Sequence, residues 1–77
     1  MDFNMENYKK KRGALYMLIS LCDANNGCLD IENGEVIRVF NDAEDIVKIE
    51  YQNGKIGLLA DAEFETMDRA IRDYQNK

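Results

Sequence analysis

The chain has 77 residues with no histidine, tryptophan or proline, and its 10 basic and 15 acidic side chains give a net charge of −5. Without histidine the chain lacks the commonest general base and the commonest metal ligand, and two cysteines alone cannot complete a tetrahedral zinc site. No stretch approaches the roughly 18 to 20 apolar residues that span a bilayer. The composition therefore predicts one small cytoplasmic domain that is not an enzyme, binds no metal or other cofactor and makes no membrane contact.

The acidic charge is unevenly distributed. Residues 1–20 carry four basic and two acidic side chains, whereas residues 21–77 carry six basic and thirteen acidic ones. An acidic body argues against a protein that binds nucleic acid over its whole face. A domain of this size also buries only about 60% of the surface that its unfolded chain exposes, so its stability is marginal. Either its core is efficient or a second copy or a partner completes it.

Residues 1–13 are predicted to form an N-terminal arm, and residues 14–77 a single domain. Apolar side chains are sparse in the arm, and four basic residues, 9–12, are consecutive. This tract could contact nucleic acid or an anionic surface, although such a charge run at a chain end is usually only solvated. It precedes an apolar stretch, as in a secretory signal, but no small-residue cleavage site follows.

Residues 14–21 fit two kinds of secondary structure. Alternate residues from Leu15 to Leu21 are apolar, which suits a buried strand, whereas Leu15, Leu18 and Cys22 lie at helical spacing. Periodicity alone cannot decide between strand and helix in so short a stretch. Gly13 before it and the polar loop after it favour the strand, and the helix stays open as the alternative.

Asn-Gly dipeptides at 33–34 and 53–54 separate stretches in which apolar and polar residues alternate. Both residue types tolerate the positive φ angles of a two-residue type I′ turn, so each dipeptide predicts a tight antiparallel hairpin. Lys48 and Glu50 are expected to face solvent. The inner face is expected to consist of the apolar residues on both sides of the second turn: Val47, Ile49, Tyr51, Ile56, Leu58 and Ala60.

The C-terminal part is predicted to be a helix over residues 61–75. Apolar residues recur at spacings of three and four between Phe64 and Tyr74, which makes one apolar stripe. Asp61 is placed to accept hydrogen bonds from the free amides of the first turn. A last short strand at residues 64–67 stays open as the alternative.

In this order, the elements resemble an SH3-like small β-barrel over about residues 14–67. Ala14-Leu15-Tyr16 is similar to the opening of the "ALYDY" motif, Asn33-Gly34-Glu35-Val36-Ile37 to the "GE-x-I" turn, and residues 53–59 to the "G-x-x-GL" strand. Leu18-Ile19 and Asp23 also resemble the "LI-x-x-x-D" opening of short uncharacterised barrel proteins from bacteriophages and mobile elements. The resemblance implies a mainly β, SH3-like antiparallel barrel or meander of four to five strands with a C-terminal helix.

The residues that would bind a proline-rich peptide in an SH3 domain are missing. Leu18 stands in place of the second tyrosine of the first motif, no tryptophan is present, and residues 60–63 replace the "PSNY" segment. We therefore expect no binding of proline-rich peptides.

Two functional hypotheses remain. The first is a non-enzymatic protein-interaction module, encoded by a phage or mobile element, that binds a host protein or a second copy through a sheet edge or the terminal helix. Its candidate anchor residues are Tyr16, Phe40 and Tyr51. The alternative is an acidic inhibitor that imitates nucleic acid and binds a basic host protein. Its candidate residues form two clusters: Asp42, Glu44 and Asp45, and Asp61, Glu63 and Glu65. Nucleic acid itself is not expected as a partner, because the body is acidic.

Overall fold

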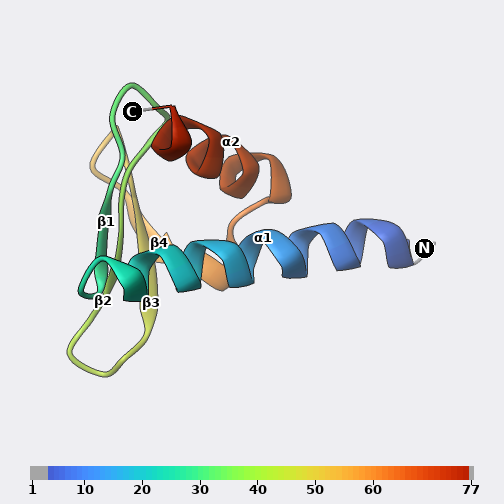
Figure 1. The fold of residues 1–77 in the computed structure, drawn as a ribbon, viewed down its shortest axis with the longest axis horizontal. Coiled ribbons are helices and arrows are strands. Elements are labelled where there is room, and N and C mark those ends of the chain that lie inside the picture. Colours follow the sequence, from blue (N-terminus) through green and yellow to red (C-terminus); the bar gives the residue numbers. More distant parts are fainter. Residues whose placement is uncertain (1–3, 77) are drawn as a thin grey trace.

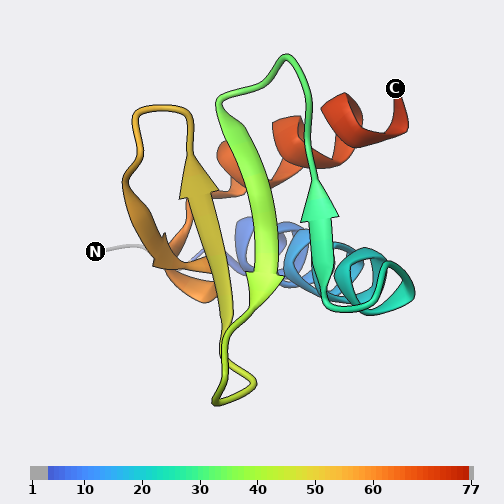
Figure 2. The same ribbon diagram turned by 90° about the vertical axis from the view of Figure 1, so that its left-hand side faces the viewer.

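The computed structural model describes residues 4–76, which form two α-helices and one antiparallel sheet. Helix α1 (Met5–Ala24) is followed by strands β1 (Cys28–Asp30), β2 (Val36–Asn41), β3 (Val47–Tyr51) and β4 (Ile56–Leu58), a 3₁₀ turn η1 (Leu59–Asp61) and helix α2 (Phe64–Gln75). Figure 1 shows both helices on the same side of the sheet, and Figure 2 looks onto the opposite face, which neither of these helices covers. The α+β class and the C-terminal helix are confirmed.

The sheet is open. Its strands lie in the order β1-β2-β3-β4 with antiparallel neighbours, so β1 and β4 each pair with a single strand. The closed SH3-like barrel is therefore not confirmed. The expectation of a mainly β protein is also wrong, since the helices hold 20 and 12 residues whereas the strands hold 3, 6, 5 and 3.

Residues 14–21 lie within α1, so the strand favoured for them is wrong and the helical alternative is observed. Ala14, Leu18 and Cys22 recur every four residues and form the buried stripe of this helix. Met17, which a strand would have turned inward with its neighbours at alternate positions, is 46% exposed. Gly13 lies within the helix and does not end it, and an added Cβ there would meet nothing within 4 Å, so no close contact requires glycine at this position.

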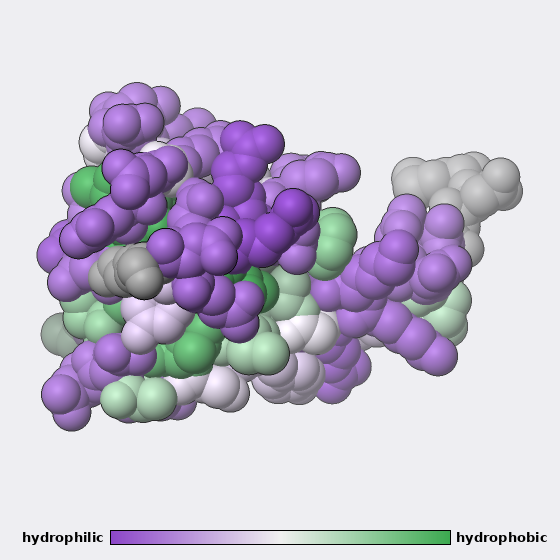
Figure 3. Space-filling model, turned by 45° about the horizontal axis from the view of Figure 1, so that its top comes forward, coloured by the Kyte–Doolittle hydropathy of each residue, from purple (hydrophilic) through white to green (hydrophobic). Residues whose placement is uncertain are grey.

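Most of the predicted arm is the first part of α1. Its residues from Met5 onward are helical, and residues 1–3 lie outside the described part of the chain. The side chain of Asn4 caps the helix, because its Oδ1 accepts the backbone N–H groups of Glu6 at 3.0 Å and Asn7 at 3.2 Å. The first half of α1 extends beyond α2 (Figure 1), and Figure 3 shows mainly hydrophilic side chains over this projection.

The loop at Asn53-Gly54 contains one residue more than the predicted two-residue turn. The N–H of Tyr51 donates to the carbonyl of Lys55 at 2.9 Å, and the N–H of Gly54 donates to the carbonyl of Tyr51 at 2.9 Å. Residues 52–54 therefore connect the strands, with Gly54 at a φ of +88°. This is a type I turn followed by a left-handed glycine, the common form of the three-residue hairpin loop.

That extra residue changes which side chains of β4 point inward. Ile49 pairs with Gly57, while Lys48 pairs with Leu58 and Glu50 with Ile56. Directly opposed residues share a face of the sheet, and a shift of one residue moves every side chain to the other face. The predicted inner positions of Ile56 and Leu58 are therefore wrong, because both lie on the outer face with Lys48 and Glu50.

The loop at Asn33-Gly34 also differs from a two-residue turn. The N–H of Ile31 donates to the carbonyl of Ile37 at 2.9 Å, so five residues lie between the paired positions. Asn33 takes the positive φ, of 64°, and Gly34 does not. The carboxylate of Asp73 on α2 lies where a Cβ at position 34 would be, so any other residue there would require this carboxylate to move. The loop thereby approaches the second helix closely.

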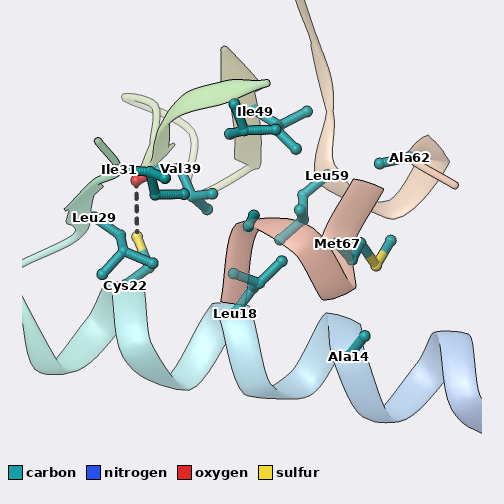
Figure 4. Close-up of a cluster of buried hydrophobic side chains, with 12 residues drawn as sticks. Ala14, Leu18, Cys22, Leu29, Ile31, Val39, Ile49, Leu59, Ala62 and Met67 are labelled. Atoms are coloured by element: carbon teal, nitrogen blue, oxygen red, sulfur yellow. Dashed lines mark hydrogen bonds between the residues drawn. The ribbon is translucent and has the colours of Figure 1, made fainter. Parts of the chain in front are cut away.

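The core lies between the helices and the inner face of the sheet (Figure 4). Its largest fully buried side chains come from every layer: Leu18 and Cys22 from α1, Leu29, Val36, Val39 and Ile49 from the sheet, Leu59 from η1 and Met67 from α2. The thiol of Cys22 donates a weak hydrogen bond to the carbonyl of Val39 at 3.6 Å.

Helix α2 begins at Phe64, three residues after the predicted start. Asp61 belongs to η1 and does not cap the helix; the N-cap position is Glu63, whose side chain makes no capping hydrogen bond. The alternative strand at residues 64–67 is not formed. The predicted apolar stripe is confirmed, because Met67 is buried and Phe64 packs against the core.

Candidate interaction surface

The outer face of the sheet consists of two rows of side chains that cross all four strands. The strand register places Cys28, Phe40, Lys48 and Leu58 in one row, and Asp30, Arg38, Glu50 and Ile56 in the other. Neighbours within a row are directly opposed, the arrangement in which cross-strand side chains interact most strongly. Each row therefore combines charged and apolar groups over the width of the sheet.

Two ion pairs hold the basic side chains of this face, while the exposed Asp30 forms no ion pair within residues 4–76. Arg38 contacts Glu50 at 2.8 Å, and its guanidinium lies 4.5 Å from the centre of the Phe40 ring. Lys48 contacts Asp42, the residue that follows β2, at 3.1 Å. Partly exposed pairs of this kind contribute little to folding stability. They do, however, leave the face with few unpaired charges.

Apolar side chains remain exposed beside these pairs. Ile56 is 51% exposed and Leu58 is 43% exposed, both on β4. Ile37 is 38% exposed, next to the irregularity in the register between Val36 and Arg38. Isolated exposed apolar residues are common, but a set on one uncovered sheet face is typical of an interaction surface.

The three predicted anchor residues do not come together. Phe40 lies on the outer face, where Arg38 covers part of its ring. Tyr51 ends β3 on the inner side and packs against the core. Tyr16 lies on α1, 55% exposed. Of the three candidate anchors, Phe40 therefore lies on the outer face of the sheet, whereas Tyr51 lies on the inner face, where the alternation of the strand predicted it.

Tyr16 belongs to a separate group on the projecting half of α1. The guanidinium of Arg12 donates to the hydroxyls of Tyr16 at 3.1 Å and Tyr8 at 3.3 Å. These hydrogen bonds, that to Tyr16 first, raise the pKa of Arg12, which is protonated at neutral pH in any case. Together with Lys11 and Ala60, these side chains line a shallow hollow between α1 and η1.

The first acidic cluster has a structural role. Asp42 accepts the backbone N–H groups of Glu44 at 2.8 Å and Ile46 at 3.0 Å, and it pairs with Lys48. The hydrogen bond from Glu44, then that from Ile46 and then Lys48 lower the pKa of the Asp42 carboxyl. Asp45 adopts a φ of 61° in the same turn. Of the predicted residues here, only Glu44 and Asp45 are exposed, whereas Asp42 organises the turn.

The second acidic cluster spans the connection between β4 and α2 and the first turn of α2. Asp61, Glu63 and Glu65 are all exposed. Glu65 occupies the first turn of α2, where a negative charge interacts favourably with the helix dipole. Glu63 and Glu65 also border a hollow between the two helices that Lys11 lines. The two acidic clusters thus belong to different connections of the chain.

Other features give no further indication of chemistry. Within residues 4–76, no three cysteine, aspartate or glutamate side chains are close enough to hold a metal ion. No helix in that part of the chain has the length and apolar character needed to cross a membrane. Comparison of the chain with protein-family models, curated proteins and solved structures finds no match.

Sequence reasoning missed Ile37, Ile56, Leu58 and Arg38 as surface residues. For the two residues of β4, the signal that could have found them is the length of the hairpin loop. An Asn-Gly pair fits the last two positions of a three-residue loop as well as both positions of a two-residue loop. The sequence of the turn was therefore compatible with Ile56 and Leu58 on either face of the sheet.

Proposed function

We propose that this chain is a non-enzymatic protein-interaction module whose contact surface is the outer face of the sheet. The observation that carries the proposal is the combination of exposed Ile56 and Leu58 with two ion pairs on the same uncovered face, beside Ile37, which is exposed at the irregularity of β2. The partner is a protein of the cell in which the chain acts, or a second copy.

The chemistry of this face suits a protein partner. Burial of apolar area drives most protein association, and the fully buried centre of an interface is depleted in unpaired charge. Arg38, which contacts both Glu50 and Phe40, is the type of residue often found at energetically important positions of interfaces. A partner that covers this face would bury the Arg38–Glu50 and Lys48–Asp42 ion pairs as pairs. Within residues 4–76 the Nε of Arg38 is buried without a hydrogen-bond partner, so the partner would need to supply an acceptor there.

The acidic-mimic hypothesis has less support. Mimicry needs carboxylates arrayed along one face and free to meet basic groups. Asp42 already binds two backbone N–H groups and Lys48, and the two acidic clusters lie in different connections.

The proposal is tested with Ile37→Lys, which introduces a charge at an exposed position of β2, next to Arg38 of the outer face and away from β4. The matched control is Met17→Lys, which makes the same change at a comparably exposed site on α1. Circular dichroism first verifies that both variants fold. Tagged protein is then used to capture partners from a lysate of the source cell at low and high salt, and the affinity of the captured protein is measured by calorimetry.

We expect wild type and Met17→Lys to capture the same protein, with little dependence on salt, and Ile37→Lys to lose it. Equal capture by Ile37→Lys would contradict the assignment of the outer face. Capture of a basic nucleic-acid-binding protein that is lost at high salt would instead favour the acidic mimic.

A further inference from the structure

The two edges of the open sheet present different backbone groups to solvent. Tyr51 donates its N–H to the carbonyl of Lys55, so these two residues face one another across the β3–β4 ladder. Along an antiparallel strand, residues whose N–H and C=O groups bond to the neighbouring strand alternate with residues whose groups point away from it. Gly57, like Lys55, therefore directs its backbone groups toward β3, opposite Ile49. The N–H and C=O groups of Ile56 and Leu58 therefore point away from the sheet. By the same alternation, Cys28 and Asp30 present theirs at the β1 edge.

The β1 edge is protected within the molecule. The outward N–H of Cys28 donates to the carbonyl of Asn25, in the turn that follows α1, at 3.4 Å. The second outward residue, Asp30, is charged and exposed. Bonded amides and charged side chains are two of the devices by which natural sheets avoid pairing with another strand.

The β4 edge has no such protection. Neither Ile56 nor Leu58 is charged, and within residues 4–76 no hydrogen bond reaches their outward N–H groups or the C=O of Ile56. The C=O of Leu58 accepts the first hydrogen bond of η1 and keeps a second lone pair for another donor. Figure 2 shows β4 at the side of the sheet, with no strand of the described chain beyond it. An uncharged edge strand with exposed aliphatic side chains is a template for another strand.

We propose that a second copy of this chain occupies this edge, with the two β4 strands antiparallel about a two-fold axis through Gly57. In this register Ile56 of one copy lies opposite Leu58 of the other. Both residues have outward N–H and C=O groups, so each such pair exchanges two hydrogen bonds. The contact uses the same residues on both copies, which is the requirement for a closed two-fold dimer.

The side chains fit this register as well as the backbone does. Ile56 and Leu58 project from the outer face, so each isoleucine meets the leucine of the other copy as a cross-strand apolar pair. Lys55 lies opposite Leu59 of the second copy, at the start of the turn that ends in Asp61, which brings opposite charges to both ends of the contact. The two outer faces become one surface of eight strands. The pairing extends the proposed function but does not depend on the identity of its partner.

The first test removes the outward donor of Leu58. This residue has a φ of −77° and a ψ of 135°, which proline can adopt, and its N–H makes no bond to β3. Leu58→Pro thus removes one N–H per copy and is compatible with the monomer fold, whereas Leu58→Val keeps the donor and an apolar side chain. Sedimentation equilibrium over a range of concentrations measures the dissociation constant of each protein.

We expect wild type and Leu58→Val to approach twice the 8.9 kDa of one chain as concentration rises. The loss of two interchain hydrogen bonds per dimer should weaken the dissociation constant of Leu58→Pro by about thirtyfold or more. A wild-type chain that stays monomeric at the highest concentration, or a Leu58→Pro variant that dimerises like wild type, would overturn the proposal.

The second test traps the pair covalently. The two-fold axis places the two Gly57 Cα atoms about 4.5 Å apart, as in other pairs without hydrogen bonds, and this distance permits a disulfide. A Cβ at Gly57 would meet nothing within 4 Å, and the same is true of Gly13 on α1, which provides the control. We expect mild oxidation to convert Gly57→Cys into a covalent dimer, while Gly13→Cys and wild type stay monomeric. Equal cross-linking of the two variants would refute the register.

These tests are distinguishable from that of the outer face. Ile37 lies on β2, so Ile37→Lys should lose the captured partner and keep the wild-type dissociation constant of the dimer. Leu58→Pro should become monomeric whether or not a partner is captured.

Discussion

Replacement of Ile49 by alanine should destabilise the protein far more than replacement of Ile56 by alanine. Both residues were expected to face inward, on the basis of a two-residue turn at Asn53-Gly54. The three-residue loop instead leaves Ile49 fully buried opposite Gly57 and turns Ile56 outward. The pair of variants therefore tests the register of the last hairpin, and with it the position of the whole outer face.

The expected magnitudes follow from burial. Ile49→Ala removes three carbon atoms from a fully buried site, which at about 0.8 kcal/mol for each group gives about 2.4 kcal/mol before any cavity is considered. The cavity, which lies between β2 and β4, raises the loss in free energy of unfolding to about 3 kcal/mol, within the usual range for such changes. Ile56 is 51% exposed and encloses no cavity, so its loss should be about 1 kcal/mol or less.

Urea unfolding followed by far-UV circular dichroism measures both values. Each variant is unfolded at two protein concentrations, so that a contribution from self-association, which would depend on concentration, is separated from the stability of the single chain. Equal losses for the two variants in the monomer would refute the reasoning, because they would mean that Ile56 is as deeply buried as Ile49 and that the two-residue register is correct.

Three further outcomes are expected. Hydrogen bonds from the backbone N–H groups of Glu44 and Ile46, and then Lys48, lower the pKa of the Asp42 carboxyl. The contribution of Asp42 to stability is therefore complete above a pH of about 4 and is lost as the pH falls through the lowered pKa. In a plot of the urea midpoint against pH, Asp42→Asn should make the decrease at acidic pH less steep. Burial raises the pKa of the Cys22 thiol, which should react with a thiol reagent only on unfolding, whereas half-buried Cys28 should react in the folded protein; simultaneous reaction would contradict the packing. Asn4→Ala should accelerate amide exchange in the first turns of α1 and leave the global urea midpoint unchanged, since those turns are exposed; a lowered midpoint would mean that they contribute to the core.

The C-terminal helix was predictable because its pattern is long and regular. The stripe of Phe64, Met67, Ile71 and Tyr74 fits the helical period. Met67 belongs to the core, and the other three side chains pack against it. Its start was misplaced by three residues. Asp61 resembles a capping residue in the sequence, but the chain first makes the tight turn η1 there, which brings Leu59 into the core.

The N-terminal helix was not predictable from periodicity alone. Its first half carries no apolar stripe, because those residues extend beyond the body, and the buried residues of the helix are Ala14, Leu18 and Cys22. The same short stretch also has apolar residues at alternate positions, as a strand would. Gly13 resembles a boundary in the sequence, yet it lies within the helix at a cost of about 1 kcal/mol relative to alanine.

The candidate surface follows from the length of the loop between β3 and β4, which the Asn-Gly pair alone does not determine. With the observed loop, the inward position of β4 opposite Ile49 is a glycine, so the strand contributes almost no side chain to the core and is held by its backbone bonds to β3 and by the buried Leu59 beyond it. Its two large side chains, Ile56 and Leu58, are left on the outside with an unbonded edge beside them. In the single chain these aliphatic groups gain little from folding. Association is therefore the process in which their burial would have its main energetic effect.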